Sequence, residues 1–341
     1  MSRLNRLFFV LVVLLLFSTM ATARSRQPQE SLDALLDGHK IVNIVDDFLI
    51  FWEQAKGRTL PVQRRLFARL VEAKYPVYFE RAVYRNAPEE ERRALLNQFL
   101  AQIPAHIGAL KQFNRTVEDE IRLNIANFKY RFPEYRQQRD IYIGLSFFMF
   151  DGSVRAVQNE VGIPDTLCLS AEVLCDYPLE ELQIAITHEL FHLYHFGFLF
   201  ANVSFAQLRT GHLPLIVEGL AIAGTEAVYP HQSLALYLHF TETELAAQRD
   251  DLAVNARRFL ELLKHGAKAE KYGEWFTDAP GDEAPKRGGY LLGYEVAQRL
   301  LGGYRFAQIV RMSPERLHEH IEEHLKAIAS ERILLLCSPN F

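Results

Sequence analysis

Residues 188–192 read HELFH, and they lie inside an apolar run with the character of a helix. In a helix, side chains four residues apart lie on the same face, so His188 and His192 can present two imidazole nitrogens to one metal ion. Glu189 is placed to accept a proton from a water held at that ion. The pattern H-E-x-x-H on a helix therefore predicts a catalytic site with one zinc ion per chain.

A catalytic zinc site usually has a third protein ligand, and the nearby candidates are His195, His212, Glu218 and Glu226. His195 lies further along the same helix, where its ring is carried away from the ion, so we expect it beside the ligands or in the cleft wall. Glu218 is favoured, because Gly219 and Ala223 give a second predicted helix a small face that can approach the zinc helix closely. Glu226 either orients a ligand histidine or faces solvent.

The order of these motifs resembles that of the gluzincin clan of metallopeptidases, which includes thermolysin and the aminopeptidase N family. In the latter family an E-G-x-A segment carries the third ligand, and the similar EGLA at 218–221 implies that Glu218 has this role. A downstream Y-x-x-G is matched by YLLG at 290–293. It implies that Tyr290 stabilises the oxyanion, with Tyr294 as the alternative. The resemblance covers roughly residues 141–301 and rests on a handful of positions.

The chain also departs from both named families. Twenty-five residues separate His192 from Glu218, which is more than in either family. There is no G-x-M-E-N-type segment to bind a free amino terminus, and Ile222 stands where the thermolysin type has an aspartate. The chain therefore looks closer to small uncharacterised bacterial gluzincins, and aminopeptidase specificity is not expected.

Periodicity predicts an α+β fold, mostly helical, with a small mixed sheet packed against the zinc helix. We expect residues 1–23 to be a signal peptide, 24–135 a helical N-terminal subdomain and 136–341 the catalytic domain. Helices are predicted at 41–55, 61–74, 89–103, 178–197, 214–230 and 290–301, and a loop at 277–288. Strands are predicted at 141–150, at 153–157 as its returning partner, and at 166–169.

The N-terminus has the pattern of a secretory signal. Arg3 and Arg6 precede an apolar stretch from Leu7 to Phe17, and residues 21–23 read ATA, a small-x-small cleavage pattern. We expect an exported protein, periplasmic or extracellular, without a stable membrane anchor after cleavage; a retained anchor is the alternative. Export would allow two of the three cysteines to pair, Cys168 and Cys175 being close in sequence, although buried free thiols are an equal alternative.

Composition and net charge do not indicate a function by themselves, so the functional prediction depends on these motifs. The formal net charge is −4, and no basic face interleaved with aromatic residues suggests nucleic acid. We expect a zinc-dependent peptidase that acts on peptides or proteins, with the strand near 166–169 pairing with an extended substrate as edge strands do. Two alternatives remain open: a zinc amidase that acts on cell-wall peptides, and a non-catalytic scaffold that binds peptides. The oligomeric state is not predicted.

Overall fold

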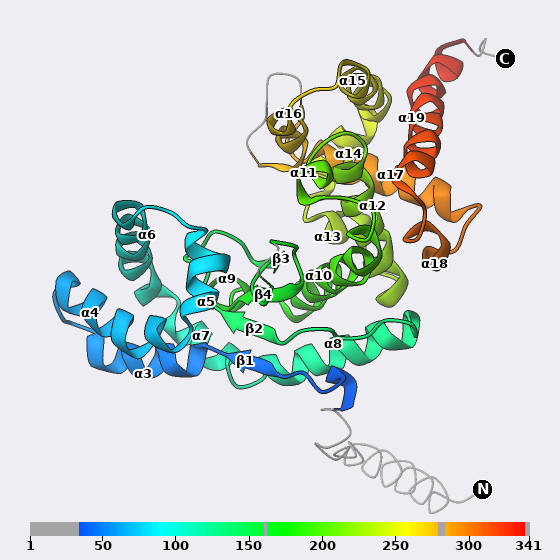
Figure 1. The fold of residues 1–341 in the computed structure, drawn as a ribbon. Helices are drawn as coiled ribbons and strands as arrows, with labels where there is room; N and C mark the ends of the chain where they lie inside the picture. The colour runs from blue at the N-terminus through cyan, green and yellow to red at the C-terminus, as the bar shows by residue number, and fades with distance from the viewer. Residues whose placement is uncertain (1–33, 160–161, 279–283, 338–341) are drawn as a thin grey trace, which may run out of the picture.

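The computed structural model describes residues 34–159, 162–278 and 284–337. Figure 1 shows a small sheet at the centre, helices of the N-terminal part on one side, and the helices from residue 205 onward on the other. The predicted α+β, mostly helical class is confirmed. The proposed signal segment lies outside the described residues. Among those described, no helix is both long and apolar enough to cross a membrane.

The sheet has four strands in the order β1-β2-β4-β3, with β1 and β2 parallel, β2 and β4 parallel, and β3 and β4 antiparallel. It is therefore mixed, as predicted. The strands are β1 (Ile41–Asn43), β2 (Ile141–Gly144), β3 (Gly152–Arg155) and β4 (Thr166–Ser170).

Two of the strand predictions were wrong in detail. The strand predicted at 141–150 ends at Gly144, because Phe147 and Phe148 both adopt left-handed backbone with φ of 62°. The buried carboxylate of Glu172 accepts hydrogen bonds from the backbone N–H groups of Ser146 (2.7 Å) and Phe148 (3.1 Å), which stabilises this turn. The chain consequently turns away, and β3 returns beside β4 instead of pairing with β2.

The helices are mostly where periodicity placed them. In the N-terminal part they are α3 (Val45–Ala55), α4 (Leu60–Leu70), α5 (Pro76–Tyr78), α6 (Glu89–Gln102), α7 (Ile107–Phe113) and α8 (Val117–Arg131). The helix predicted from residue 41 was wrong at its start, since residues 41–43 form the edge strand β1. Their backbone pairs with β2, a contact between segments about a hundred residues apart that helical periodicity does not reveal.

The C-terminal part adds the remaining helices. They are α9 (Ala171–Leu174), α10 (Leu179–Leu199), α11 (Phe205–Leu208), α12 (Leu213–Val228), α13 (Leu234–Leu238), α14 (Glu242–Asp250), α15 (Leu252–His265), α16 (Ala269–Gly273), α17 (Gly288–Leu301), α18 (Phe306–Ile309) and α19 (Pro314–Cys337). Gly197 was predicted to stop the zinc helix, but α10 continues to Leu199 with that glycine inside it.

One apolar core runs through the N-terminal helices, the sheet and the C-terminal helices. The ring of Phe147, in the turn after β2, stacks on Phe99 of α6 with centroids 4.7 Å apart. Tyr78 is buried, stacks on Tyr142 of β2 and donates a hydrogen bond to the carbonyl of Leu145. Aromatic side chains bury large areas, so these contacts hold the N-terminal helices to the sheet.

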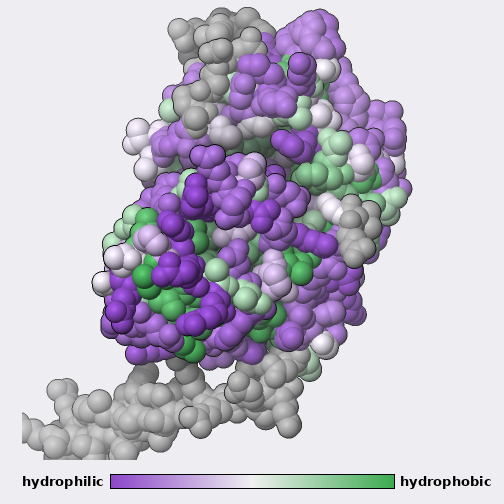
Figure 2. Space-filling view, turned by 60° about the vertical axis from the view of Figure 1, so that its left-hand side comes forward, coloured by the Kyte–Doolittle hydropathy of each residue, from purple (hydrophilic) through white to green (hydrophobic). Residues whose placement is uncertain are grey.

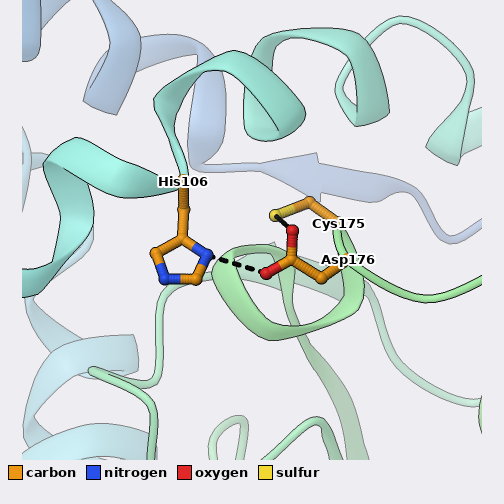
Figure 3. Close-up of side chains that lie close together, drawn as sticks. All are labelled: His106, Cys175 and Asp176. Carbon is orange, nitrogen blue, oxygen red and sulfur yellow. Dashed lines mark hydrogen bonds and ion pairs between the residues drawn. The ribbon is translucent and has the colours of Figure 1, made fainter.

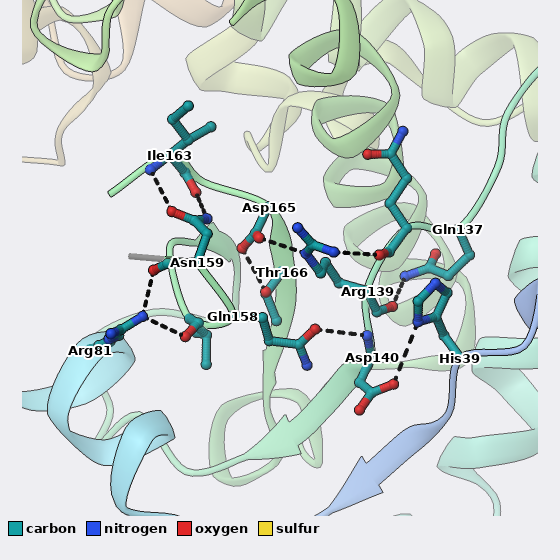
Figure 4. Close-up of polar contacts among 12 residues, drawn as sticks. His39, Arg81, Gln137, Arg139, Asp140, Gln158, Asn159, Ile163, Asp165 and Thr166 are labelled. Atoms are coloured by element: carbon teal, nitrogen blue, oxygen red, sulfur yellow. Dashed lines mark hydrogen bonds and ion pairs between the residues drawn. The ribbon is translucent and has the colours of Figure 1, made fainter. Parts of the chain in front are cut away.

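Polar contacts among the loops next to β2, β3 and β4 also attach the N-terminal part to the sheet (Figure 4). Arg81, from the N-terminal part, donates hydrogen bonds to the backbone carbonyls of Val157 (3.1 Å) and Asn159. The guanidinium of Arg139 pairs with Asp165 at 2.8 Å, so the segments that precede β2 and β4 are joined. The two described ends of the segment between β3 and β4 are thus held, residues 157 and 159 by the N-terminal part and Asp165 by the segment that precedes β2.

On the face of the molecule seen in Figure 2, hydrophilic residues predominate and hydrophobic residues form smaller groups. Seven large hydrophobic side chains are exposed among the described residues, scattered over several elements: Ile50, Val77, Leu123, Tyr130, Met149, Leu179 and Phe205. Singly exposed apolar residues are ordinary on a folded protein and need no functional explanation.

Candidate metal centre

Three side chains from two helices converge on one point. The Nε2 atoms of His188 and His192, both on α10, are 3.0 Å apart. A carboxylate oxygen of Glu218, on α12, lies 3.2 Å from the first and 3.5 Å from the second. The structure thus brings together the three residues that the sequence predicted as ligands.

This arrangement fits a zinc ion. Zn–N and Zn–O bonds of ~2.0–2.1 Å in a tetrahedron require ligand atoms roughly 3.3 Å apart, and the three observed separations bracket that value. Burial alone would raise the pKa of Glu218, but the neighbouring His192 and His188 lower it well below its usual range. Glu218 therefore offers an anionic oxygen. Two imidazoles and a carboxylate form a ligand set typical of catalytic zinc.

The close contact between α12 and α17 positions Glu218. A Cβ on Gly219 would lie 2.1 Å from the carbonyl oxygen of Gly293, and one on Gly293 would lie 2.3 Å from that of Leu215. Only glycine allows the two backbones to approach this closely. These glycines belong to the EGLA and YLLG segments, so the same contact brings Glu218 and Tyr290 into one cavity.

The small face was predicted to pack against the zinc helix, and this was wrong. Gly219 packs against α17, and it is Gly224 that meets the zinc helix, where an added Cβ would lie 2.1 Å from the ring of Phe191. The sequence contains small residues at 219, 221, 223 and 224 on a nearly apolar helix. Spacing alone did not show which of them faces which neighbour.

Glu189 and Tyr290 line the same cavity of about 510 Å³ as the three converging side chains. Burial raises the pKa of Glu189 to about 7, and the nearby negative charges of Asp151 and Glu218 act in the same direction. A carboxylate with a pKa near neutrality suits a group that must both accept and release a proton. The pKa of Tyr290 is also raised by burial, so its hydroxyl stays a hydrogen-bond donor.

Tyr294 and Glu226 lie away from this cavity. The Tyr294 hydroxyl donates to Glu226 at 2.9 Å, and Gln298 donates to the same carboxylate oxygen at 2.7 Å. Both predictions for Glu226 were therefore wrong, since it neither orients a ligand histidine nor simply faces solvent. Of the two candidate tyrosines, Tyr290 is the one that lines the cavity with the converging ligands.

The remaining histidine candidates also lie outside the group. His195 is buried and does not line the cavity, so of the two places expected for it the cleft wall is excluded. Its Nδ1 has no hydrogen-bond partner among the described residues. His212 precedes α12, and its Nδ1 lies 3.2 Å from Nδ1 of His318 on α19.

The sequence reading gave no functional role to several other residues of the cavity, among them Asp151, Tyr177, His239 and Arg287. The Tyr177 hydroxyl donates to Asp151 at 3.0 Å, and the Arg287 guanidinium lies 4.5 Å from the centre of the Tyr290 ring. Arg287 precedes Tyr290 by three residues, but it lies just before α17 with left-handed backbone (φ 52°), so helical spacing would not have indicated this contact. Nothing local indicated Asp151, which reads as part of a turn.

The edge of the sheet that faces the cavity is β3. Gly152, Ser153 and Val154 line it, and an added Cβ on Gly152 would lie 2.8 Å from the side chain of Glu189. The strand at 166–169 was predicted to act as the edge, and this was wrong, because β4 is paired on both sides. The order of strands is a tertiary property and puts β3 in that place.

A family model agrees with this geometry. The family described as "Predicted Zn-dependent protease (DUF2268)" matches residues 138–319, more than half of the chain. The chain belongs to this family. All three converging side chains, Glu189 and Tyr290 fall inside the match, whereas β1 and helices α3–α8 precede it. A family of predicted zinc-dependent proteases implies a peptide or protein substrate. Comparisons with curated proteins and with solved structures found no match.

Proposed function

We propose that this chain is an exported zinc-dependent peptidase of the gluzincin type. The observation that carries the proposal is the convergence of His188, His192 and Glu218 at ligand distances, with Glu189 and Tyr290 in the same cavity. A zinc ion held there would polarise the scissile carbonyl and acidify a water molecule. The family match supports the zinc-protease part of the proposal.

The residues around the site have distinct roles in this proposal. Glu189 accepts the proton of the attacking water and later gives it to the leaving nitrogen, and its raised pKa suits both transfers. The Tyr290 hydroxyl donates a hydrogen bond to the carbonyl oxygen as that oxygen gains charge. The free edge of β3 offers backbone groups with which an extended peptide can pair, leaving its scissile bond over Glu189.

Export is proposed from the sequence of residues 3–23, with its basic start, apolar stretch and small-x-small end. Expression of the full chain in a bacterial host followed by intact mass measurement tests it. The periplasmic form should lack residues 1–23. A cytoplasmic protein with its N-terminus intact would contradict export without bearing on the chemistry of the site.

The chemistry is tested first by metal content. The zinc content of the purified chain should fall when His188→Ala or Glu218→Ala removes one ligand of the catalytic site. The Glu189→Gln variant should keep its zinc, because the glutamate does not belong to the converging group. A folded parent protein that resists zinc reconstitution would overturn the site.

Activity is tested by cleavage of casein with and without a chelator. Glu189→Gln should lower the rate by ~10²–10⁴-fold, the usual contribution of a positioned general base. Glu180→Gln is the matched control, since it makes the same change at an exposed position of the same helix. If Glu189→Gln cleaves as well as the control, Glu189 is not the base. A parent that binds peptides but cleaves none would favour the scaffold alternative.

A further inference from the structure

A second group of metal-ligating side chains lies on the molecule, formed by His106, Cys175 and Asp176 (Figure 3). The Nδ1 of His106 lies 2.8 Å from one carboxylate oxygen of Asp176. The Cys175 sulfur lies 3.9 Å from the other oxygen of the same carboxylate. One potential ligand atom from each residue lies within 4.8 Å of the other two.

The group shares no residue with the catalytic candidates and comes from different elements. His106 directly precedes α7, in the N-terminal part of the chain. Cys175 and Asp176 follow α9, in the segment that leads into α10. Cys168 and Cys175 are both free, so the disulfide between them that the sequence allowed is not formed and the Cys175 sulfur is available as a ligand.

The donor set selects the kind of ion. A thiolate, an imidazole and a carboxylate together suit zinc and similar borderline ions, whereas calcium and magnesium require oxygen ligands. About half of the Asp176 side chain and 29% of the His106 side chain are exposed. Water can therefore reach the group and supply a fourth ligand.

We propose that His106, Cys175 and Asp176 bind a second divalent ion of the zinc class. The ion joins the start of α7 to the end of α9, two segments that are distant in the sequence. Tyr177 follows Asp176 directly and lines the catalytic cavity, where its hydroxyl holds Asp151. A metal ion bound by Cys175 and Asp176 thus fixes the segment that contains Tyr177 and continues into α10.

Cobalt(II) titration of the metal-free full chain, kept reduced with a non-thiol reagent, tests the proposal. A thiolate bound to cobalt gives a near-ultraviolet charge-transfer band that imidazole and carboxylate ligands do not give. The catalytic candidates contain no sulfur, so this band reports only on the second site. We expect the band to appear and to saturate at one cobalt per chain for that site.

Variants separate the two sites. His188→Ala should keep the charge-transfer band in full, because the second site is intact. Cys175→Ser should lose the band, and its cobalt content should be one ion per chain lower than that of the parent. His106→Ala should weaken or abolish the band although the sulfur remains. Absence of the band in the parent, or its persistence in Cys175→Ser, would overturn the proposal and leave an ordinary ion pair.

Thermal unfolding gives a second measurement that does not depend on activity. In the His188→Ala background, added zinc should raise Tm in a concentration-dependent way, because an ion that binds the folded state stabilises it. The same zinc series on His188→Ala with Cys175→Ser should leave Tm unchanged. An equal zinc-dependent rise in both proteins would contradict a site at Cys175. Failure here would leave the catalytic proposal standing, since that is tested through His188, Glu189 and Glu218.

Discussion

Tyr290 and Tyr294 show how much one helical turn decides in this molecule. They lie on the same helix, α17, and both pKa values are raised by burial. Tyr290 lines the cavity of the converging ligands, whereas the Tyr294 hydroxyl is engaged by Glu226. One turn along α17 thus moves a tyrosine from the cavity that Glu218 lines to the carboxylate of Glu226.

The pair supplies a matched test of the oxyanion role. Tyr290→Phe removes only a hydroxyl and should lower kcat by ~10²–10³-fold with zinc content unchanged, as expected for one lost donor. Tyr294→Phe removes the same hydroxyl from a tyrosine outside the cavity and should keep kcat within about threefold of the parent. Steady-state cleavage of a fluorogenic peptide measures both. Equal losses in the two variants would show that Tyr290 has no special part in the reaction.

We expect the buried His195 to make the free energy of unfolding depend on pH. Burial, and secondarily the charge of His192, lowers the pKa of His195 to about 3, below its ordinary value of 6.5. Between those values the unfolded chain binds a proton that the folded chain does not. Stability from this group is therefore fully present above pH 6.5 and is lost as the pH falls toward the folded pKa, by roughly 1 kcal/mol per pH unit.

Urea unfolding of metal-free protein from pH 7 to pH 4 measures this effect. His195→Leu should reduce the dependence of the unfolding free energy on pH in this window. His265→Gln, at a largely exposed histidine, is the control and should leave the dependence unchanged. If His195→Leu shows the same dependence as the parent, the buried histidine is not the group that titrates.

At the scale of elements, the crossing of α12 and α17 matters most to the site. Two glycines allow the backbones to touch, and each lies close to a candidate functional residue: Gly219 follows Glu218, and Gly293 lies one turn after Tyr290. The helices themselves were predictable from local periodicity. Their partners were not, because a small-residue face fits several neighbours equally well.

Gly293→Ala tests the crossing. The added methyl group would meet the Leu215 carbonyl oxygen, so the helices must separate. We expect a loss of ~1–3 kcal/mol in the free energy of unfolding, as for other overpacked sites, together with reduced activity. Gly108→Ala in α7 is the control, because no atom lies within 4 Å of the added Cβ. Urea unfolding of both variants measures the difference, and unchanged stability of Gly293→Ala would contradict the close contact.

At the scale of the whole molecule, the N-terminal part belongs to the same core as the sheet. It provides the edge strand β1, the Tyr78 ring against β2 and the Phe99 ring against Phe147. The family match begins only at residue 138 and so excludes these elements. The matched region alone would leave β2 unpaired on one side and its aromatic contacts exposed to water.

We therefore predict that residues 136–341 do not fold by themselves. Expressed alone, this fragment should be insoluble or lack a cooperative thermal transition, whereas residues 24–341 should unfold cooperatively. Circular dichroism and limited proteolysis of both proteins provide the measurement. A fragment that unfolds cooperatively and binds zinc as the longer chain does would show that the N-terminal part is dispensable for folding.

The sequence by itself determined the features that depend on local spacing. HELFH on one helix places His188 and His192 four residues apart and Glu189 beside them, and helical geometry alone puts both imidazoles on one face. The small residues that follow Glu218 favoured it as the third ligand, and the resemblance to gluzincins supported that choice and added Tyr290. The tertiary structure decided which segments meet: α12 packs against α10 at Gly224 and against α17 at Gly219, which brings Glu218 to both the histidines and Tyr290, and the strand order makes β3 the edge beside the cavity. Such contacts join residues that are far apart in the chain. They depend on how the surfaces of whole helices and strands pack together, and a local sequence pattern contains no information about that packing.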